Sequence, residues 1–152
     1  MALSFARQVD GCWASAQAAQ SQYVWSFFGA ANGLFRTMPA HVVKKRYEAA
    51  KRPWFMASVA NKDAATGKFG VTVSTPYLDA SGAGEVITVS RVITRGGTGA
   101  SDPVAGVLGI DFKLDEVQRL VNAQAHCGHA SSVCMLLDET AHLVFHDDFV
   151  PT

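Results

Sequence analysis

The sequence has no net charge and no long apolar run, and each absence excludes a class of protein. Thirteen Lys and Arg residues balance thirteen Asp and Glu residues, so no net positive field attracts nucleic acid or an anionic membrane. No stretch approaches the roughly eighteen apolar residues of a membrane-spanning helix, and the N-terminus lacks a basic segment followed by an apolar core and a cleavage site. We therefore expect no nucleic-acid partner and no membrane span in this chain.

Cysteine is scarce and odd in number, with Cys12, Cys127 and Cys134 only. Cys127 and Cys134 lie close enough in sequence to close a small disulfide loop, which would stabilise the fold by roughly 2 to 3 kcal/mol. A zinc site that uses His126 and His129 beside these cysteines is the alternative, but a second well-spaced pair of ligands is lacking. We favour the disulfide and no metal. Cys12 then pairs elsewhere in a longer parent chain or stays a free buried thiol.

The common catalytic motifs are also lacking. Ser74, Ser90 and Ser101 have no Gly-x-Ser-x-Gly context and no histidine in a recognisable sequence relation, although a nucleophile needs a base within hydrogen-bond reach. The glycine-rich stretch Gly96–Gly99 is not followed by Lys-Ser or Lys-Thr, so it indicates a hairpin loop and not a phosphate cradle. We expect neither enzyme activity nor a cofactor.

The residues that are present predict one α+β domain with a sizeable core, since 49% are hydrophobic and only 17% are charged. Alternating apolar residues and turn signals predict a five-stranded antiparallel sheet. The expected strands are Tyr23–Ala30, Leu34–Met38, Phe69–Ser74, Glu85–Ile93 and Val104–Phe112, and the expected helices are Cys12–Gln22, Pro39–Lys51 and Leu114–Ala125, with a helical turn over Trp54–Asn61 and a further hairpin within Val133–His146. Asn32-Gly33 is a strong signal for a hairpin turn between the first two strands.

The stretch Tyr47–Ser58 is the most informative in the chain. Arg52 precedes Pro53, and a proline disfavours the α conformation for the residue before it, so we expect a helix to end here and Arg52 to be extended. An extended Arg52 and Trp54 point to the same side, which places a planar guanidinium beside an indole and suits a carboxylate. The plainer alternative is a surface arginine stacked on a half-buried tryptophan.

Together with Ser74–Asp79, Glu85–Ile93 and Val104–Leu114, this stretch gives an order of segments that resembles the Cache family of extracellular sensor domains. That family includes bacterial chemoreceptors and the Cache region of calcium-channel α2δ subunits. The resemblance covers roughly residues 20 to 150 and implies a PAS-like antiparallel sheet flanked by helices. It divides the chain into three parts. Residues 1–22 form a lead-in with a long N-terminal helix, residues 23–125 form a membrane-distal Cache domain, and residues 126–152 form the start of a second, truncated Cache unit.

One branch of the family resembles a sensor of free amino acids, and its motif implies a site here. Tyr47, Arg52 and Trp54 fall on the motif at the right spacing, Tyr77 takes the position of a later tyrosine, and Asp111 takes that of the aspartate. By the resemblance, Arg52 and Trp54 bind the α-carboxylate of the ligand, whereas Asp111 and Tyr77 bind its α-amine.

Three positions leave alternatives open. Phe55 departs from the family because it offers a bare ring where a tyrosine hydroxyl usually lies near the amine, so either the amine is held less fully or the ligand differs. Asp111 is also a candidate to cap the helix expected near Leu114. Tyr77 is also a candidate for a sheet-edge aromatic residue.

The resemblance implies a non-enzymatic sensor domain for a small amino-acid-like ligand, extracellular or periplasmic and part of a membrane-anchored chain, with a channel or receptor as partner. A second hypothesis is an interaction module of an α2δ-like channel subunit with a vestigial pocket, which Phe55 favours. A third is a sensor for other carboxylates, which keeps Arg52 and lacks the amine site.

Overall fold

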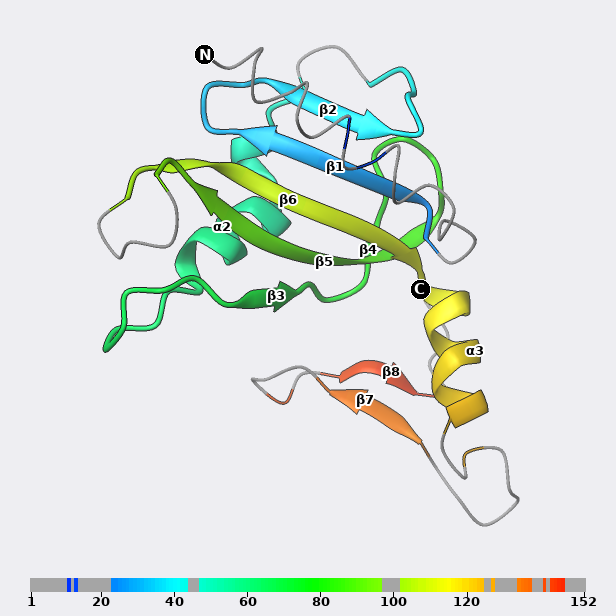
Figure 1. The fold of residues 1–152 in the computed structure, drawn as a ribbon. Helices are drawn as coiled ribbons and strands as arrows, with labels where there is room; N and C mark the ends of the chain where they lie inside the picture. The colour runs from blue at the N-terminus through cyan, green and yellow to red at the C-terminus, as the bar shows by residue number, and fades with distance from the viewer. Residues whose placement is uncertain are drawn as a thin grey trace.

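The main body is a six-stranded antiparallel sheet with strand order β2-β1-β6-β5-β3, in which β4 pairs with β5 outside this path (Figure 1). The computed structural model describes residues 11, 13, 23–43, 47–96, 102–124, 127, 134–137, 141 and 143–146. Its strands are β1 (Trp25–Ala30), β2 (Phe35–Met38), β3 (Val71–Val73), β4 (Tyr77–Leu78), β5 (Glu85–Thr94) and β6 (Val104–Lys113). The five predicted strands and the α+β class are confirmed, and β4 is an additional strand.

The first hairpin has the turn that the sequence predicts. Gly33 has a φ of 90°, a conformation that glycine adopts without a steric penalty. The Ala30 amide donates to the Leu34 carbonyl over 2.8 Å, and the Gly33 amide donates to the Ala30 carbonyl over 3.0 Å. This turn fixes the β1–β2 register, in which Phe28 lies opposite Arg36.

Helix α2 (Pro53–Ala60) packs on β5, β3 and β6 and buries Trp54, Phe55 and Ser58. Its Trp54 ring reaches β1 because Gly29 has no side chain: a Cβ at Gly29 would lie 2.7 Å from that ring. The resulting core cluster consists of Phe27, Ala49, Trp54, Phe55, Val92 and Val107. The segment that carries the predicted site is therefore anchored in the core.

The predicted helix Pro39–Lys51 is wrong over the residues that the structure describes. Residues 39–43 are not helical, and the only helical turn in the described part of this range is η2 (Ala49–Lys51). The apolar spacing that suggested a helix does not correspond to a buried face, since Val42 is 94% exposed. Pro53 begins α2 at its first position instead of ending a helix, and proline is favoured at that position as well.

Helix α3 (Leu114–Gln124) follows β6 directly and confirms the third expected helix. The hairpin of β7 (Met135–Leu137) and β8 (Leu143–His146) confirms the strand-turn-strand pattern near the C-terminus. Leu136 and Val144 of this hairpin pack against Ile87 and Leu114. That contact joins the hairpin to the main sheet and α3.

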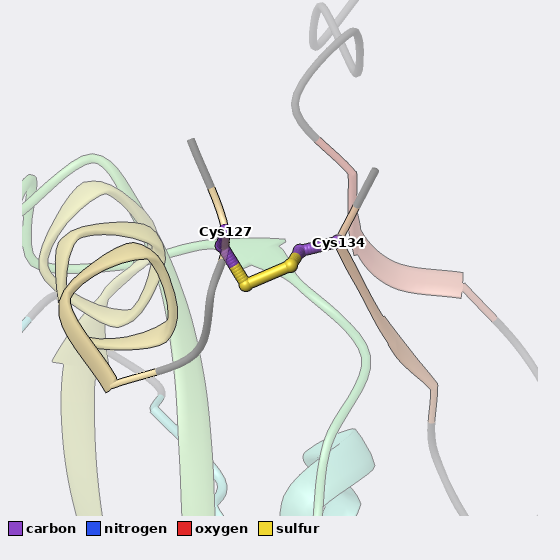
Figure 2. The surroundings of a disulfide bond; sticks show 2 residues. All are labelled: Cys127 and Cys134. Carbon is purple, nitrogen blue, oxygen red and sulfur yellow. A yellow bond between two sulfur atoms is a disulfide. The ribbon is translucent and has the colours of Figure 1, made fainter. Parts of the chain in front are cut away.

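The predicted disulfide between Cys127 and Cys134 is confirmed, with the two Cα atoms 5.6 Å apart. Figure 2 shows that it links the segment after α3 to the residue before β7. Both sulfur atoms are thereby used, and the other two candidate zinc ligands, His126 and His129, lie outside the described residues.

Most of the expected N-terminal helix Cys12–Gln22 lies outside the described residues, as does Cys12 itself. Trp13 is helical and 6% exposed, and it packs in a cluster with Phe28 and Ala30. In the described part of the chain, no helix combines the length and apolar character needed to cross a membrane. The domain boundaries at residues 22 and 125 stay predictions.

Candidate ligand-binding site

Five of the six predicted ligand-binding residues line one small cavity of about 10 Å³. They are Tyr47, Arg52, Trp54, Tyr77 and Asp111. They come from the segment before α2, from α2 itself, from β4 and from β6. The structure thus brings together residues that lie far apart in the sequence, and their ligand contacts stay a prediction.

A larger hollow of about 770 Å³ lies elsewhere, between α2, β3 and the β7–β8 hairpin. Its lining residues include Val71, Val73, Leu136 and Val144, and none of the lining residues is charged. Ligand specificity comes from a few convergent polar and charged groups more than from volume. The smaller cavity has such groups, so it is the better candidate.

Phe55 is the predicted residue that the structure does not bring to the cavity. Its side chain is 6% exposed and belongs to the core cluster, with its ring 5.7 Å from that of Trp54. Phe55 has a packing role in this structure.

Arg52 has the extended backbone that Pro53 predicts, with φ −81° and ψ 146°, at the N-cap of α2. Its guanidinium lies over the Tyr47 ring, 5.4 Å from the centroid. The Arg52 Nε atom is buried and has no hydrogen-bond partner among the described residues. The cavity wall therefore carries a cation with an unused donor.

Trp54 differs from the expected arrangement because it lies inside α2 and not beside Arg52 on an extended segment. It is 1% exposed, and its ring lies 4.7 Å from that of Phe27. Burial raises the pKa of Tyr47, while a side-chain hydrogen bond with Trp54 and the positive charge of Arg52 oppose this rise. The Trp54 side chain is thus bonded to Tyr47 at the edge of the cavity.

Asp111 lies at the centre of a row of three residues across the sheet. Trp25 on β1 and Thr88 on β5 are its direct partners in register, so the three side chains share one face. The Thr88 hydroxyl donates to Asp111 Oδ1 over 2.6 Å, and the Tyr77 hydroxyl lies 2.6 Å from Thr88 Oγ1. Because the Thr88 proton is directed to Asp111, Tyr77 is the donor to Thr88. The Asp111 side chain, which lines the cavity, thus accepts a hydrogen bond from the neighbouring strand. Tyr77 is linked to Asp111 through Thr88.

The environment of Asp111 disfavours its negative charge. Burial raises the pKa of Asp111 to about 7. The hydrogen bond from Thr88 opposes this rise, and the negative charge of Asp79 adds to it. Burial, together with the charge of Asp111, also raises the pKa of Tyr77. A cation placed beside Asp111 would favour the ionised carboxylate.

Several lining residues were not found from the sequence. Trp25 stacks on His41 with ring centroids 4.0 Å apart, and His41 Nε2 lies 2.7 Å from Ser81 Oγ. Asp79 also lines the cavity, and its Oδ2 accepts hydrogen bonds from the amides of Ser81 and Ala83. The aromatic sequence of β1 was a usable signal for Trp25, whereas no sequence signal indicates that residues 41 and 81 meet.

No protein-family model matches the chain. A VWFA and cache domain-containing protein of Drosophila melanogaster is 27% identical over 134 residues, which cover 84% of this chain and 9% of that protein. The methyl-accepting chemotaxis protein PscA of Pseudomonas syringae pv. tomato is 27% identical over 123 residues, which cover 81% of this chain and 17% of that protein.

Solved structures with a similar fold are ligand-binding domains of chemoreceptors. That of Pseudomonas fluorescens CtaA in complex with L-valine has a TM-score of 0.68 and 21% identity, covering 87% of this chain and 53% of that chain. That of Pseudomonas aeruginosa PctC in complex with GABA has a TM-score of 0.58 and 20% identity, covering 83% and 50%. These relatives confirm the resemblance to Cache sensor domains. The chain spans about half the length of the solved chains and less than a fifth of the length of the two curated relatives.

Proposed function

We propose that this chain is a non-enzymatic sensor domain that binds a small amino acid through its carboxylate and its amine. The observation that carries the proposal is the presence of Arg52 and Asp111, a cation and an acid, in the wall of one small cavity. A zwitterionic ligand offers one group of each sign. Such a ligand would pair with Arg52 and Asp111 at once, whereas an uncharged ligand would pair with neither charge.

The carboxylate end of the ligand belongs at Arg52. A guanidinium presents five N–H donors in a planar fork that matches a carboxylate, and the buried Nε of Arg52 has no partner among the described residues. A hydrogen bond between two charged groups contributes roughly 1.5 to 3 kcal/mol. Tyr47, which lies under the guanidinium, holds it in place.

The amine end belongs at Asp111 and Tyr77. Asp111 is 3% exposed, and the ammonium would supply the charge that compensates for this burial. The Tyr77 hydroxyl, fixed by Thr88, is the second oxygen on this side. The absence of a hydroxyl at Phe55 does not remove an amine contact, because that ring lies in the core.

The ligands of the similar solved structures support the proposal. The CtaA domain is solved in complex with L-valine, L-serine and L-alanine, and the PctC domain in complex with GABA. One curated relative is a methyl-accepting chemotaxis protein. We infer a location outside the cytoplasm on a membrane-anchored parent chain, with residues 126–152 as the start of a second Cache unit.

The test is thermal denaturation and calorimetry with L-valine, L-alanine, L-serine and GABA. A ligand selective for the folded state raises stability by RT ln(1 + [L]/Kd), so at least one should raise the melting temperature in proportion to the logarithm of its concentration. Arg52→Ala should weaken binding by about ten- to a hundred-fold. Arg91→Ala, at an exposed arginine on β5, is the matched control and should leave the affinity unchanged.

A second candidate is an interaction module of an α2δ-like channel subunit, which the VWFA and cache domain-containing relative favours. A cavity of about 10 Å³ fits a pocket that no longer binds. Flat melting curves at millimolar concentrations of all four amino acids would contradict the sensor proposal and support this module.

A further inference from the structure

Two tryptophans line the cavity, and they differ in what their indole N–H groups do. Trp54 is the one that family resemblance pairs with the ligand carboxylate. We propose that Trp25 takes this role instead, donating its indole N–H to the carboxylate opposite Arg52, an inference that rests on the proposed amino-acid site. The two residues approach the cavity from different sides, Trp25 from β1 and Trp54 from α2.

Trp54 is committed to the core. Its ring contacts those of Phe27, Phe35 and Phe55 at centroid distances of 4.7, 6.5 and 5.7 Å. Its side chain is hydrogen-bonded to Tyr47, and an indole has a single donor and no acceptor. A carboxylate would have to break that bond before it could use the Trp54 N–H.

Trp25, which also lines the cavity, has an unused donor. Its Nε1 atom is buried and has no hydrogen-bond partner among the described residues. Stacking on His41, 4.0 Å away, holds the ring in place. A buried donor without an acceptor is unfavourable, so an acceptor that enters the cavity gains the bond without displacing an existing partner.

Arg52 supplies a second unused donor, since its buried Nε also lacks a partner among the described residues. Both residues line a space of about 10 Å³, a volume that one water molecule fills. Its walls are therefore close together. A carboxylate has two oxygens, each of which accepts two hydrogen bonds, and one carboxylate would satisfy both donors.

The position of Trp25 also selects the ligand class. Trp25 and Asp111 are direct cross-strand partners, and such partners have Cβ atoms roughly 5 Å apart. A carboxylate held at Trp25 then lies next to the ammonium site at Asp111. That spacing suits an α-amino acid, whose carboxylate and amine share one carbon, better than GABA, in which three carbons separate them.

Trp25→Phe is the appropriate variant because it removes the N–H and keeps a ring to stack on His41. We expect this variant to weaken the binding of L-valine and of its deaminated analogue 3-methylbutanoate alike, by roughly tenfold or more. Trp13→Phe, in the cluster with Phe28 and Ala30, is the matched control and should leave both affinities unchanged. Wild-type protein should bind L-valine more tightly than GABA.

A second measurement, by NMR, follows binding to the wild-type protein and needs no variant that still binds the ligand. The indole ¹H–¹⁵N resonances of the wild-type protein, identified by their loss in the Phe variants, are followed as L-valine is added. The Trp25 resonance should move downfield as its N–H gains an anionic acceptor, and the Trp54 resonance should move less.

The outcomes separate the two proposals. A shift of the Trp54 resonance alone, or an unchanged affinity for Trp25→Phe with a large loss for Arg52→Ala, would overturn the role of Trp25 and leave the sensor function standing. Tighter binding of GABA than of L-valine would overturn the selection of α-amino acids. Failure of wild-type protein to bind L-valine, L-alanine, L-serine or GABA would overturn both proposals.

Discussion

The Thr88 hydroxyl donates a hydrogen bond to Asp111 Oδ1 across 2.6 Å, at a place where Thr88 is 0% and Asp111 3% exposed. Strands β5 and β6 set this pair opposite each other in register. The same hydroxyl accepts from Tyr77, so one threonine orients both groups proposed for the amine. The Thr88 amide in turn donates to Ser74 Oγ over 2.9 Å.

Thr88→Val keeps the branched shape and removes the hydroxyl. The hydrogen bond that favours the ionised Asp111 is lost, so the pKa of Asp111 should rise further, and the Tyr77 hydroxyl loses its acceptor. We expect the free energy of unfolding to fall by about 1 to 3 kcal/mol. At pH 7 the affinity for L-valine should fall severalfold while that for 3-methylbutanoate stays constant, as measured by calorimetry.

Thr88→Ser is the control, since it retains the hydroxyl and should keep most of the affinity for L-valine. An equal loss for L-valine and 3-methylbutanoate in Thr88→Val would mean that Thr88 acts only through packing and does not orient the amine site.

The raised pKa of Asp111 makes stability depend on pH in a defined direction. Its pKa is about 7 in the folded protein against the usual 3.8, so between these values the folded state holds a proton that the unfolded state has released. Stability from this group is fully present below pH 3.8 and is lost as the pH rises to about 7. The difference in urea midpoint between wild type and Asp111→Asn should follow that window.

The same group links ligand binding to protons. An ammonium favours the ionised carboxylate, so L-valine binding should release a proton from Asp111 at pH 6, and its affinity should rise with pH up to about 7. Calorimetry in buffers of different ionisation enthalpy measures the released proton. An affinity for L-valine that does not change between pH 5.5 and 8 would contradict a salt bridge with Asp111.

Local patterns were enough to predict the sheet. Strands β5 and β6 each have ten residues and are rich in apolar and β-branched side chains, and the Asn32-Gly33 turn specifies the first hairpin without help from distant residues. The extended backbone of Arg52 was also predictable, since it follows from the ring of Pro53 alone. The helical turn predicted over Trp54–Asn61 is confirmed by α2, which differs from it by one residue at each end. That Pro53 itself begins this helix was not predicted, because a proline both ends and begins helices.

The polar contacts of the site depend on the register between paired strands, and local sequence patterns do not predict that register. Thr88 reads as an ordinary strand residue until β5 and β6 are aligned. Phe55 was expected near the ligand because it takes the position of a tyrosine in the motif of the resembling family, but successive helical residues point about 100° apart. The structure directs Phe55 into the core instead.

His41 and Ser81 both line the cavity and join two segments of the chain, with His41 Nε2 and Ser81 Oγ 2.7 Å apart and forty positions between them in sequence. The cavity, of about 10 Å³, is too small for an amino acid. Entry of a ligand therefore requires lining segments to move, and we expect the two that this bond joins to separate. The bond lies on the exposed side of the site, whereas Trp54 and Asp111 are buried in the sheet and core.

Ser81→Ala and His41→Phe each remove this hydrogen bond, and His41→Phe keeps a ring for Trp25 to stack on. Both variants should open more easily, so the association and dissociation rate constants for L-valine should each rise severalfold, while the equilibrium affinity changes less. Stopped-flow tryptophan fluorescence measures the two rates, since Trp25 lines the cavity and stacks on His41. If both variants bind and release L-valine at the wild-type rates, then opening is controlled elsewhere, and the His41–Ser81 bond is only a surface contact.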